Sequence, residues 1–251
     1  MRKLCAAKVP CTAGCKYCFS KWNNYGLHHM VEEKIFDTAS VVLYPCCDGD
    51  YFMQQDMIET IMSYTENYNQ VLVSISSKVQ PSSEELQRLY SLNDWLVSKG
   101  RGMVKYASSL STMSMINELE PGTMDFEMRY KIAQEISQHA IPVSLTLKPI
   151  MPFVSGEEYC SIIQKYSKLT KSVLVGGLYV NKSTDFYRSY IDQKWDVEKR
   201  SVTWLPDNPT WDYVNVADQI DIIMKYCAER DIEVFESDDA LFEYILKGRT
   251  I

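Results

Sequence analysis

The sequence predicts an α/β fold, a partial (βα)6-type barrel formed by a single domain over residues 1–251. Short β-rich runs alternate with stretches of helical period, and strands that alternate with helices pair in parallel through right-handed crossovers. The length of 251 residues suits one such domain. Six or seven βα units are too few to close an eight-unit barrel, but they are enough for a partial one.

The expected strands are short runs rich in apolar and β-branched residues. In a parallel sheet, ligands bind at the carboxyl ends of the strands, so the residues that follow these runs are the candidates for function. The runs cover residues 3–7, 38–44, 71–76, 102–109, 142–147, 172–180 and 232–235.

The expected helices lie between the strands, at residues 56–67, 82–100, 123–139, 155–168, 217–230 and 239–247. Ser82 with Glu85, and Ser155 with Glu158, have the spacing of capping boxes. Thr123 is the expected cap of the third helix. These caps predict where three of the helices begin.

The segment 181–214 is aromatic, charged and irregular in pattern. We expect it to be a lid over the mouth of the barrel, because a lid that excludes water protects a reactive intermediate. The alternative is a surface loop with aromatic anchors.

The overall composition narrows the function classes. The net charge of −7 argues against an obligate nucleic-acid binder, which normally carries a basic excess. No apolar run approaches the ~18 residues that span a bilayer, and residues 1–8 lack the apolar core of a signal peptide. We therefore expect a cytoplasmic protein with no membrane partner. Its eight cysteines are expected to be metal ligands, catalytic groups or buried thiols rather than disulfides.

The strongest local signal is the cysteine loop at residues 9–19. Cys11, Cys15 and Cys18 place three thiols within eight residues, close enough for the sulfurs to fold back onto one cluster. Gly14 permits the unusual backbone angles of such a loop. An electron-transfer [4Fe–4S] cluster usually has four cysteine ligands, so three leave one iron open to bind another molecule. The loop therefore predicts an iron–sulfur cluster with a catalytic role.

Two other readings of the loop remain open. A zinc site could take a fourth ligand from Cys5, His28 or His29, although zinc ligands usually come as two separated pairs. An electron carrier could take its fourth cysteine from Cys46 or Cys47.

The spacing Cys11-x3-Cys15-x2-Cys18, with Tyr17 before the last cysteine, resembles the radical SAM superfamily. The resemblance implies a partial barrel and a [4Fe–4S] cluster whose fourth iron binds S-adenosylmethionine. It also implies an external one-electron reductant such as flavodoxin or ferredoxin. Reductive cleavage of S-adenosylmethionine would then give a 5′-deoxyadenosyl radical that removes a hydrogen atom from the substrate.

A longer stretch resembles the spore photoproduct lyase-like branch of that superfamily. By this resemblance Ser109 lies near the cofactor ribose, Arg129 near the methionyl carboxylate, and Ile150 against the adenine. Tyr44 and Pro45 occupy the strand end where the family has a Gly-Gly-Glu segment that binds the methionyl amine. The stretch comprises residues 108–112, 119–123, 129, 140–143 and 148–152.

The remaining candidates are side chains at or near the strand ends. Cys46, Asp48 and Lys148 are the catalytic candidates. Compact single-cluster members of this branch include a lyase that releases queuine from queuosine. The resemblance therefore implies a lyase acting on a small nucleoside-like substrate, with nucleic-acid lesions or an amino-acid-like metabolite as alternatives. The substrate-binding candidates are Asp50, Lys78, Tyr106, Tyr179, Asn181 and Glu236.

Overall fold

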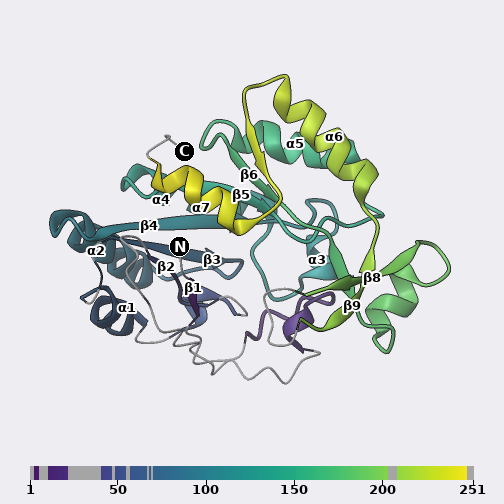
Figure 1. The fold of residues 1–251 in the computed structure, drawn as a ribbon, viewed down its shortest axis with the longest axis horizontal. Helices are drawn as coiled ribbons and strands as arrows, with labels where there is room; N and C mark the ends of the chain where they lie inside the picture. The colour runs from purple at the N-terminus through teal and green to yellow at the C-terminus, as the bar shows by residue number, and fades with distance from the viewer. Residues whose placement is uncertain are drawn as a thin grey trace.

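A parallel sheet of seven strands is the centre of the fold (Figure 1). The computed structural model describes residues 3–5, 11–21, 41–46, 49–54, 57–66, 68, 70–202 and 208–247. All neighbouring pairs in this sheet are parallel, as the alternation of strands and helices predicted. The strands, in spatial order, are β1 (Lys3–Cys5), β2 (Val41–Tyr44), β3 (Val71–Ser77), β4 (Gly102–Ser109), β5 (Val143–Leu147), β6 (Ser172–Val175) and β10 (Glu233–Phe235).

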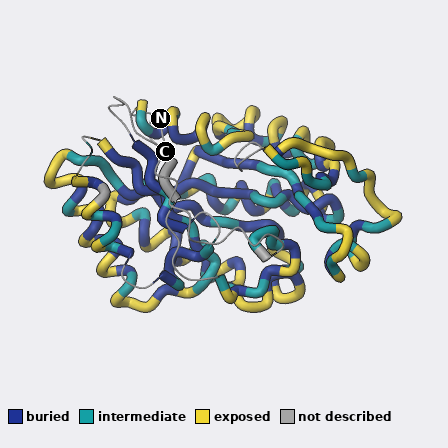
Figure 2. Tube along the Cα trace, turned by 60° about the horizontal axis from the view of Figure 1, so that its bottom comes forward, coloured by how far each residue is buried: buried dark blue, intermediate teal, exposed yellow. Residues whose placement is uncertain are grey.

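One face of the sheet packs against helices and forms the larger core. Val73 and Val104 of the sheet share this core with Leu89 and Ile132 of the helices. Figure 2 shows the strands of the sheet buried, with exposed residues along the outer helices. The helices on this side are α1 (Met57–Thr65), α2 (Ser83–Ser98), α4 (Phe126–Gln138) and α5 (Gly156–Tyr166), and α6 (Ala217–Ala228) packs on α5.

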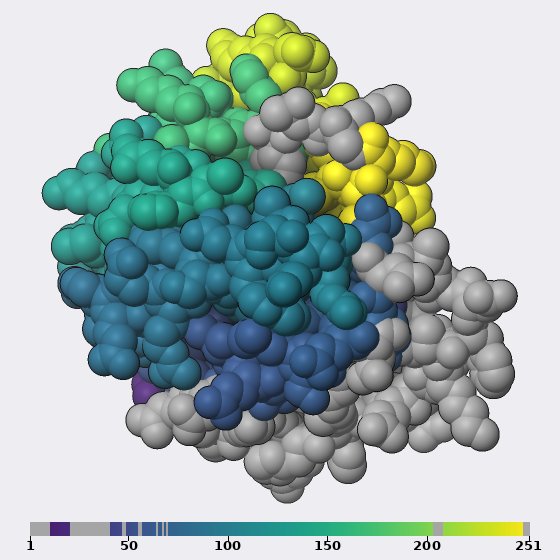
Figure 3. Space-filling view, turned by 90° about the vertical axis from the view of Figure 1, so that its left-hand side faces the viewer, coloured from purple at the N-terminus to yellow at the C-terminus, as the bar shows by residue number. Residues whose placement is uncertain are grey.

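The other face of the sheet is covered by α7 (Asp238–Leu246). Val42, Leu72 and Leu174 form a second, smaller core with Leu241 and Phe242 of this helix. Figure 3 views the layers from the side, with the C-terminal residues in yellow at the right and the blue and teal helices at the centre and left. Since successive side chains of a strand point to opposite faces, β2, β3 and β6 contribute to both cores.

A second sheet of three antiparallel strands follows the main one in the chain. It consists of β7 (Leu178–Val180), β9 (Thr210–Val214) and β8 (Val197–Ser201), in that spatial order. The single strand expected over 172–180 is therefore wrong. Gly176 and Gly177 separate β6 from β7, and a Cβ on Gly177 would lie 1.8 Å from the Tyr213 hydroxyl. The segment 181–214, expected to be irregular, contains two strands and a π-helix (Tyr187–Ile191).

Of the three predicted helix caps, one is confirmed and two differ from the prediction. The Ser82 capping box is confirmed, with both of its hydrogen bonds to Glu85 present. The second box is only half formed: Ser155 caps α5, but the Glu158 carboxylate accepts from Ser114 and other donors in residues 112–114.

Asp125, and not Thr123, caps α4, because its carboxylate accepts from the Met128 amide at 2.8 Å. The short helices α3 (Ile116–Leu119), η1 (Phe19–Lys21) and η2 (Tyr51–Met53) had no predicted counterpart. No helix in the described ranges is long and apolar enough to cross a membrane.

Candidate functional site

The cysteine loop is anchored at the carboxyl edge of the main sheet. Its backbone is tied to the segment that follows β4, because the Lys16 amide donates to Leu119 at 2.9 Å and the Gly122 amide donates to Ala13 at 2.9 Å. Gly14 has φ +77, the left-handed conformation that favours glycine. A Cβ on Gly122 would lie 2.5 Å from the Ala13 carbonyl oxygen, so the close approach requires glycine there.

The three thiols of the loop lie in one electrostatic environment. Cys15 is buried, whereas Cys11 and Cys18 are half-buried. Burial raises the pKa of Cys15 to about 11, with a smaller opposing effect from Lys78, while charge on Cys18 or Cys11 would raise it further. Within the ranges that the structure describes, no three Cys, His, Asp or Glu side chains are grouped so as to hold a metal ion. Metal binding would require deprotonation of the thiols and closure of the loop around the metal.

The donor set fits an iron–sulfur cluster in kind and number. Three thiolates are the soft ligands that such clusters use, and they come from one loop at the functional edge of the sheet. The candidates for a fourth zinc ligand lie outside the described side chains; they are Cys5, His28 and His29. The same holds for Cys47 and for the catalytic candidate Asp48.

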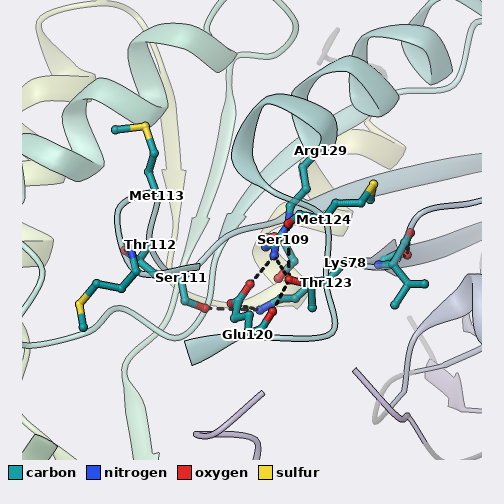
Figure 4. A network of polar contacts seen from close by, with 12 residues as sticks. Lys78, Ser109, Ser111, Thr112, Met113, Glu120, Thr123, Met124 and Arg129 are labelled. Atoms are coloured by element: carbon teal, nitrogen blue, oxygen red, sulfur yellow. Dashed lines mark hydrogen bonds and ion pairs between the residues drawn. The ribbon is translucent and has the colours of Figure 1, made fainter. Parts of the chain in front are cut away.

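A buried ion network is tied to this loop, and Figure 4 shows its members Lys78, Glu120 and Arg129. Glu120 is fully buried and accepts from Lys78 Nζ at 2.7 Å and from Arg129 Nη2 at 2.5 Å. Tyr17 lies between Cys15 and Cys18 in the sequence. Its hydroxyl contacts Glu120, Lys78 and Ser111. Burial alone would raise the pKa of Glu120, but Lys78 and Arg129 together lower it to about 2. The carboxylate therefore stays charged at neutral pH and links the loop to two cations.

Arg129 makes contacts other than the expected one. Its guanidinium is fully buried and donates to the carbonyls of Met124 at 2.8 Å and Ser109 at 2.9 Å. It also donates to Thr123, and it pairs with the Glu120 carboxylate. Arg129 therefore braces the end of β4, where half-buried Ser109 lies. A second carboxylate at this guanidinium would have to displace a buried ion pair.

Two substrate candidates are core residues. The Asp50 carboxylate is buried and accepts four hydrogen bonds, from the Phe52, Lys78 and Val79 amides and the Ser77 hydroxyl. Through these four hydrogen bonds the Asp50 carboxylate joins η2 to the end of β3.

Tyr106 is fully buried in the larger core, on the face that the helices cover. Strand alternation turns its neighbour Lys105 to the face that α7 covers, and a role for Tyr106 in substrate binding stays a prediction. Ile150 is fully buried as well, and its amide donates to Gly176 at 2.7 Å.

A second polar group joins the ends of β2 and β5. Asp238, at the start of α7, accepts from the Tyr44 hydroxyl at 2.7 Å and pairs with Lys148 Nζ at 2.9 Å. The predicted candidate Glu236, directly after β10, is exposed and stays a prediction. Asp238 could have been found from its place directly after the helix cap Ser237. The structure thus brings two candidates, Tyr44 and Lys148, together through a residue that was missed.

The segment 181–214 lies against the cysteine loop, shown in purple beside β8 and β9 in Figure 1. The rings of Tyr17 and Phe186 are 6.2 Å apart, and those of Phe19 and Trp211 are 5.7 Å apart. Tyr179 of β7 is half-buried with its ring 5.8 Å from Trp211.

Three candidates remain, at two places in the fold. The Asn181 side chain accepts from the Ser183 amide at 2.9 Å in a local turn. At the end of β2, Pro45 and Cys46 are buried. The roles of Asn181, Pro45 and Cys46 stay predictions.

The comparisons with known proteins agree on the fold. A cysteine variant of spore photoproduct lyase superposes with a TM-score of 0.62 at 12% identity, covering 88% of this chain and 72% of that chain. Spore photoproduct lyase complexed with dinucleoside spore photoproduct gives a TM-score of 0.58, with the same identity and coverage. Streptococcus suis SuiB bound to S-adenosylmethionine gives 0.55 at 12% identity, covering 94% of this chain and 49% of that chain. No family model and no curated protein sequence matches the chain. The similarity confirms the predicted fold class, an α/β fold that forms a partial barrel.

Proposed function

We propose that this protein is a radical SAM enzyme in which Cys11, Cys15 and Cys18 bind a [4Fe–4S] cluster and the open iron binds S-adenosylmethionine. When both are bound, the cluster and S-adenosylmethionine would supply a 5′-deoxyadenosyl radical that abstracts hydrogen from a small nucleoside-like substrate. The observation that carries the proposal is the three-thiol loop anchored at the carboxyl edge of the sheet. A structural neighbour with this fold was solved with S-adenosylmethionine, which supports the choice of cofactor.

The chain's own residues hold and cover this site. The Glu120 network fixes Tyr17 and so fixes the backbone between Cys15 and Cys18. The segment 181–214 packs its aromatic rings on the same loop and acts as the lid that excludes water. Ser109 and Ile150 stay our proposals for the cofactor ribose and adenine. Arg129 stays our proposal for the methionyl carboxylate, and it also braces the end of β4.

For the substrate we propose a modified nucleoside and a lyase reaction, such as the release of queuine from queuosine. A neighbour that binds a dinucleoside supports a nucleoside-sized substrate. The net charge of −7 disfavours nucleic acid as the partner. Lys148, held by Asp238, and Cys46 are the catalytic candidates, and a flavodoxin or ferredoxin in the cytoplasm would supply the electron.

Anaerobic reconstitution with iron and sulfide tests the proposal directly. We expect about four irons and four sulfides per chain, and a change in the spectrum of the reduced cluster when S-adenosylmethionine is added. The Cys15→Ala variant should lose the cluster, while Cys160→Ala, which changes a cysteine on α5, should keep it. One zinc per chain with no cluster would refute the proposal.

Turnover tests the substrate separately. The reduced, reconstituted protein should release queuine from queuosine and form 5′-deoxyadenosine with it. If 5′-deoxyadenosine forms without cleavage of queuosine, the enzyme class stands and this substrate is wrong.

A further inference from the structure

Lys105 is a buried cation that the cysteine site does not use. It lies within β4, is 2% exposed, and its ammonium is 5.8 Å from the ring centroid of Phe242 on α7. In the part of the chain that the structure describes, this ammonium makes no hydrogen bond and no ion pair. A buried charge without a partner costs several kcal/mol, and such exceptions concentrate at functional sites.

Three buried hydroxyls share this side of the sheet. The oxygens of Ser144 and Thr146 on β5 and of Ser172 on β6 have no hydrogen-bond partner among the described residues. Ala107 pairs in register with Ser144, so Lys105 and Ser144 project from the same face. Thr146 follows Ser144 by two residues. Leu145 pairs with Val173, which makes Ser144 and Ser172 cross-strand neighbours. Three unsatisfied hydroxyls and the buried Lys105 therefore gather on neighbouring strands of one face.

The charges near this group leave a positive excess. Burial lowers the pKa of Lys105 to about 7, while Asp238 raises it and Lys148 lowers it. Asp238 already pairs with Lys148 at 2.9 Å. A protonated Lys105 therefore adds one positive charge that this ion pair does not neutralise, and a single anionic group would neutralise it. Burial of that anion beside lysine would also satisfy hydroxyl donors that now have no acceptor.

We propose that the α7-covered face of β4, β5 and β6 binds an anionic group of the substrate, a carboxylate or a phosphate, and that Lys105 is its principal ligand. Ser144, Thr146 and Ser172 supply hydroxyl donors to the same group. The assignment to the substrate rests on the proposed function, but the anion site itself rests on the burial and the unmet hydrogen bonds. Neither the cysteine loop nor the Glu120 network contributes to it.

Titration of the full chain with inorganic phosphate, and separately with acetate, tests the site by calorimetry and by the thermal midpoint. The two probes distinguish a phosphate site from a carboxylate site. Lys105→Met should weaken binding of the preferred probe by about ten- to hundredfold, the range for a charged hydrogen bond. The same variant should be at least as stable as the wild type without the probe, because it removes a buried, unpartnered charge. The matched control Lys131→Met removes an exposed lysine on α4 and should leave binding unchanged.

Two outcomes would overturn the proposal. If Lys105→Met unfolds more easily without ligand and still binds the probe, the lysine is structural. If Lys131→Met weakens binding as much as Lys105→Met does, the effect is one of general charge. Thr146→Val is a second variant in case Lys105→Met does not fold. It should leave the stability of the free protein unchanged, since the Thr146 hydroxyl has no hydrogen-bond partner among the described residues, and it should weaken binding of the probe.

The test is independent of the cluster. Cys15→Ala, which cannot hold the cluster, should bind the anion as tightly as the wild type does. A wild type that holds the cluster but binds no anion would refute the anion site alone, whereas a wild type that binds the anion but takes up no cluster on reconstitution would refute the proposed function alone.

Discussion

Replacing Glu120 with glutamine tests how the cysteine loop is held. The carboxylate lies between Lys78 and Arg129 and also accepts from Tyr17. Glutamine keeps the shape but carries no charge, and its amide nitrogen presents donors to groups that are themselves donors. Arg129 would then be a fully buried cation without a counter-charge.

The expected cost can be worked from the structure in two ways. The pKa of Glu120 falls from 4.5 to about 2 in the folded protein, and 2.5 pH units at ~1.4 kcal/mol each amount to about 3 kcal/mol. Breaking a buried ion pair by removing one partner typically costs about 3–5 kcal/mol. Both routes give a loss of about 3–5 kcal/mol, or roughly 6–20 °C in the thermal midpoint of a chain this size.

Urea unfolding followed by circular dichroism measures this loss. Glu127→Gln is the matched control, because Glu127 pairs with Lys165 at 2.5 Å on the exposed side of α4 and should cost at most about 1 kcal/mol. A double change of Glu120 and Arg129 to apolar residues should cost less than the sum of the single changes. If Glu120→Gln costs no more than Glu127→Gln, the buried network does not stabilise the loop.

Three further predictions concern the same edge of the sheet. Because the folded pKa of Glu120 lies below its unfolded value, the stabilisation is present above about pH 4.5 and lost towards about pH 2, so the difference between wild type and Glu120→Gln should shrink from pH 7 to pH 3; a constant difference would contradict this. Gly122→Ala should displace Ala13 and reduce the iron bound on reconstitution; full iron content would show that the close approach is dispensable. Asp50→Asn should lower stability to urea by about 2–3 kcal/mol, since an amide cannot accept all four of its hydrogen bonds; a loss under about 0.5 kcal/mol would argue against this brace.

The fold was largely predictable because its signals are local. The strand at residues 102–109 and the Ser82 capping box depend on neighbouring residues alone, and both were found as expected. The break at Gly176 and Gly177 was missed because it depends on Tyr213, which lies over 30 residues away in the chain. The same holds for Glu158, whose carboxylate caps residues 112–114 rather than its own helix.

The site was less predictable because a residue type does not reveal which way its side chain points. Tyr106 and Lys105 are neighbours on β4, and both are buried. Because adjacent side chains of a strand point to opposite faces, Tyr106 lies in the larger core and Lys105 on the α7-covered face. Asp50 was expected to bind substrate, but its carboxylate accepts hydrogen bonds from the amides of Lys78 and Val79 after β3. Asp238 was missed since its partners Tyr44 and Lys148 come from distant strands. The roles of Ser109 and Ile150 stay predictions.

The cysteine loop and the Lys105 site are linked through one strand. Arg129 joins the Ser109 carbonyl at the end of β4 to Glu120, and Glu120 holds the loop through Tyr17. Lys105 lies four residues before Ser109, which is about 13 Å along the strand. An anion bound at Lys105 would therefore leave roughly the length of a nucleoside between itself and the level of the loop. A substrate anchored by its anionic end at Lys105 would place its other end at the edge of the sheet where we propose that the radical forms, and the rigid strand between them would set which hydrogen atom is within reach.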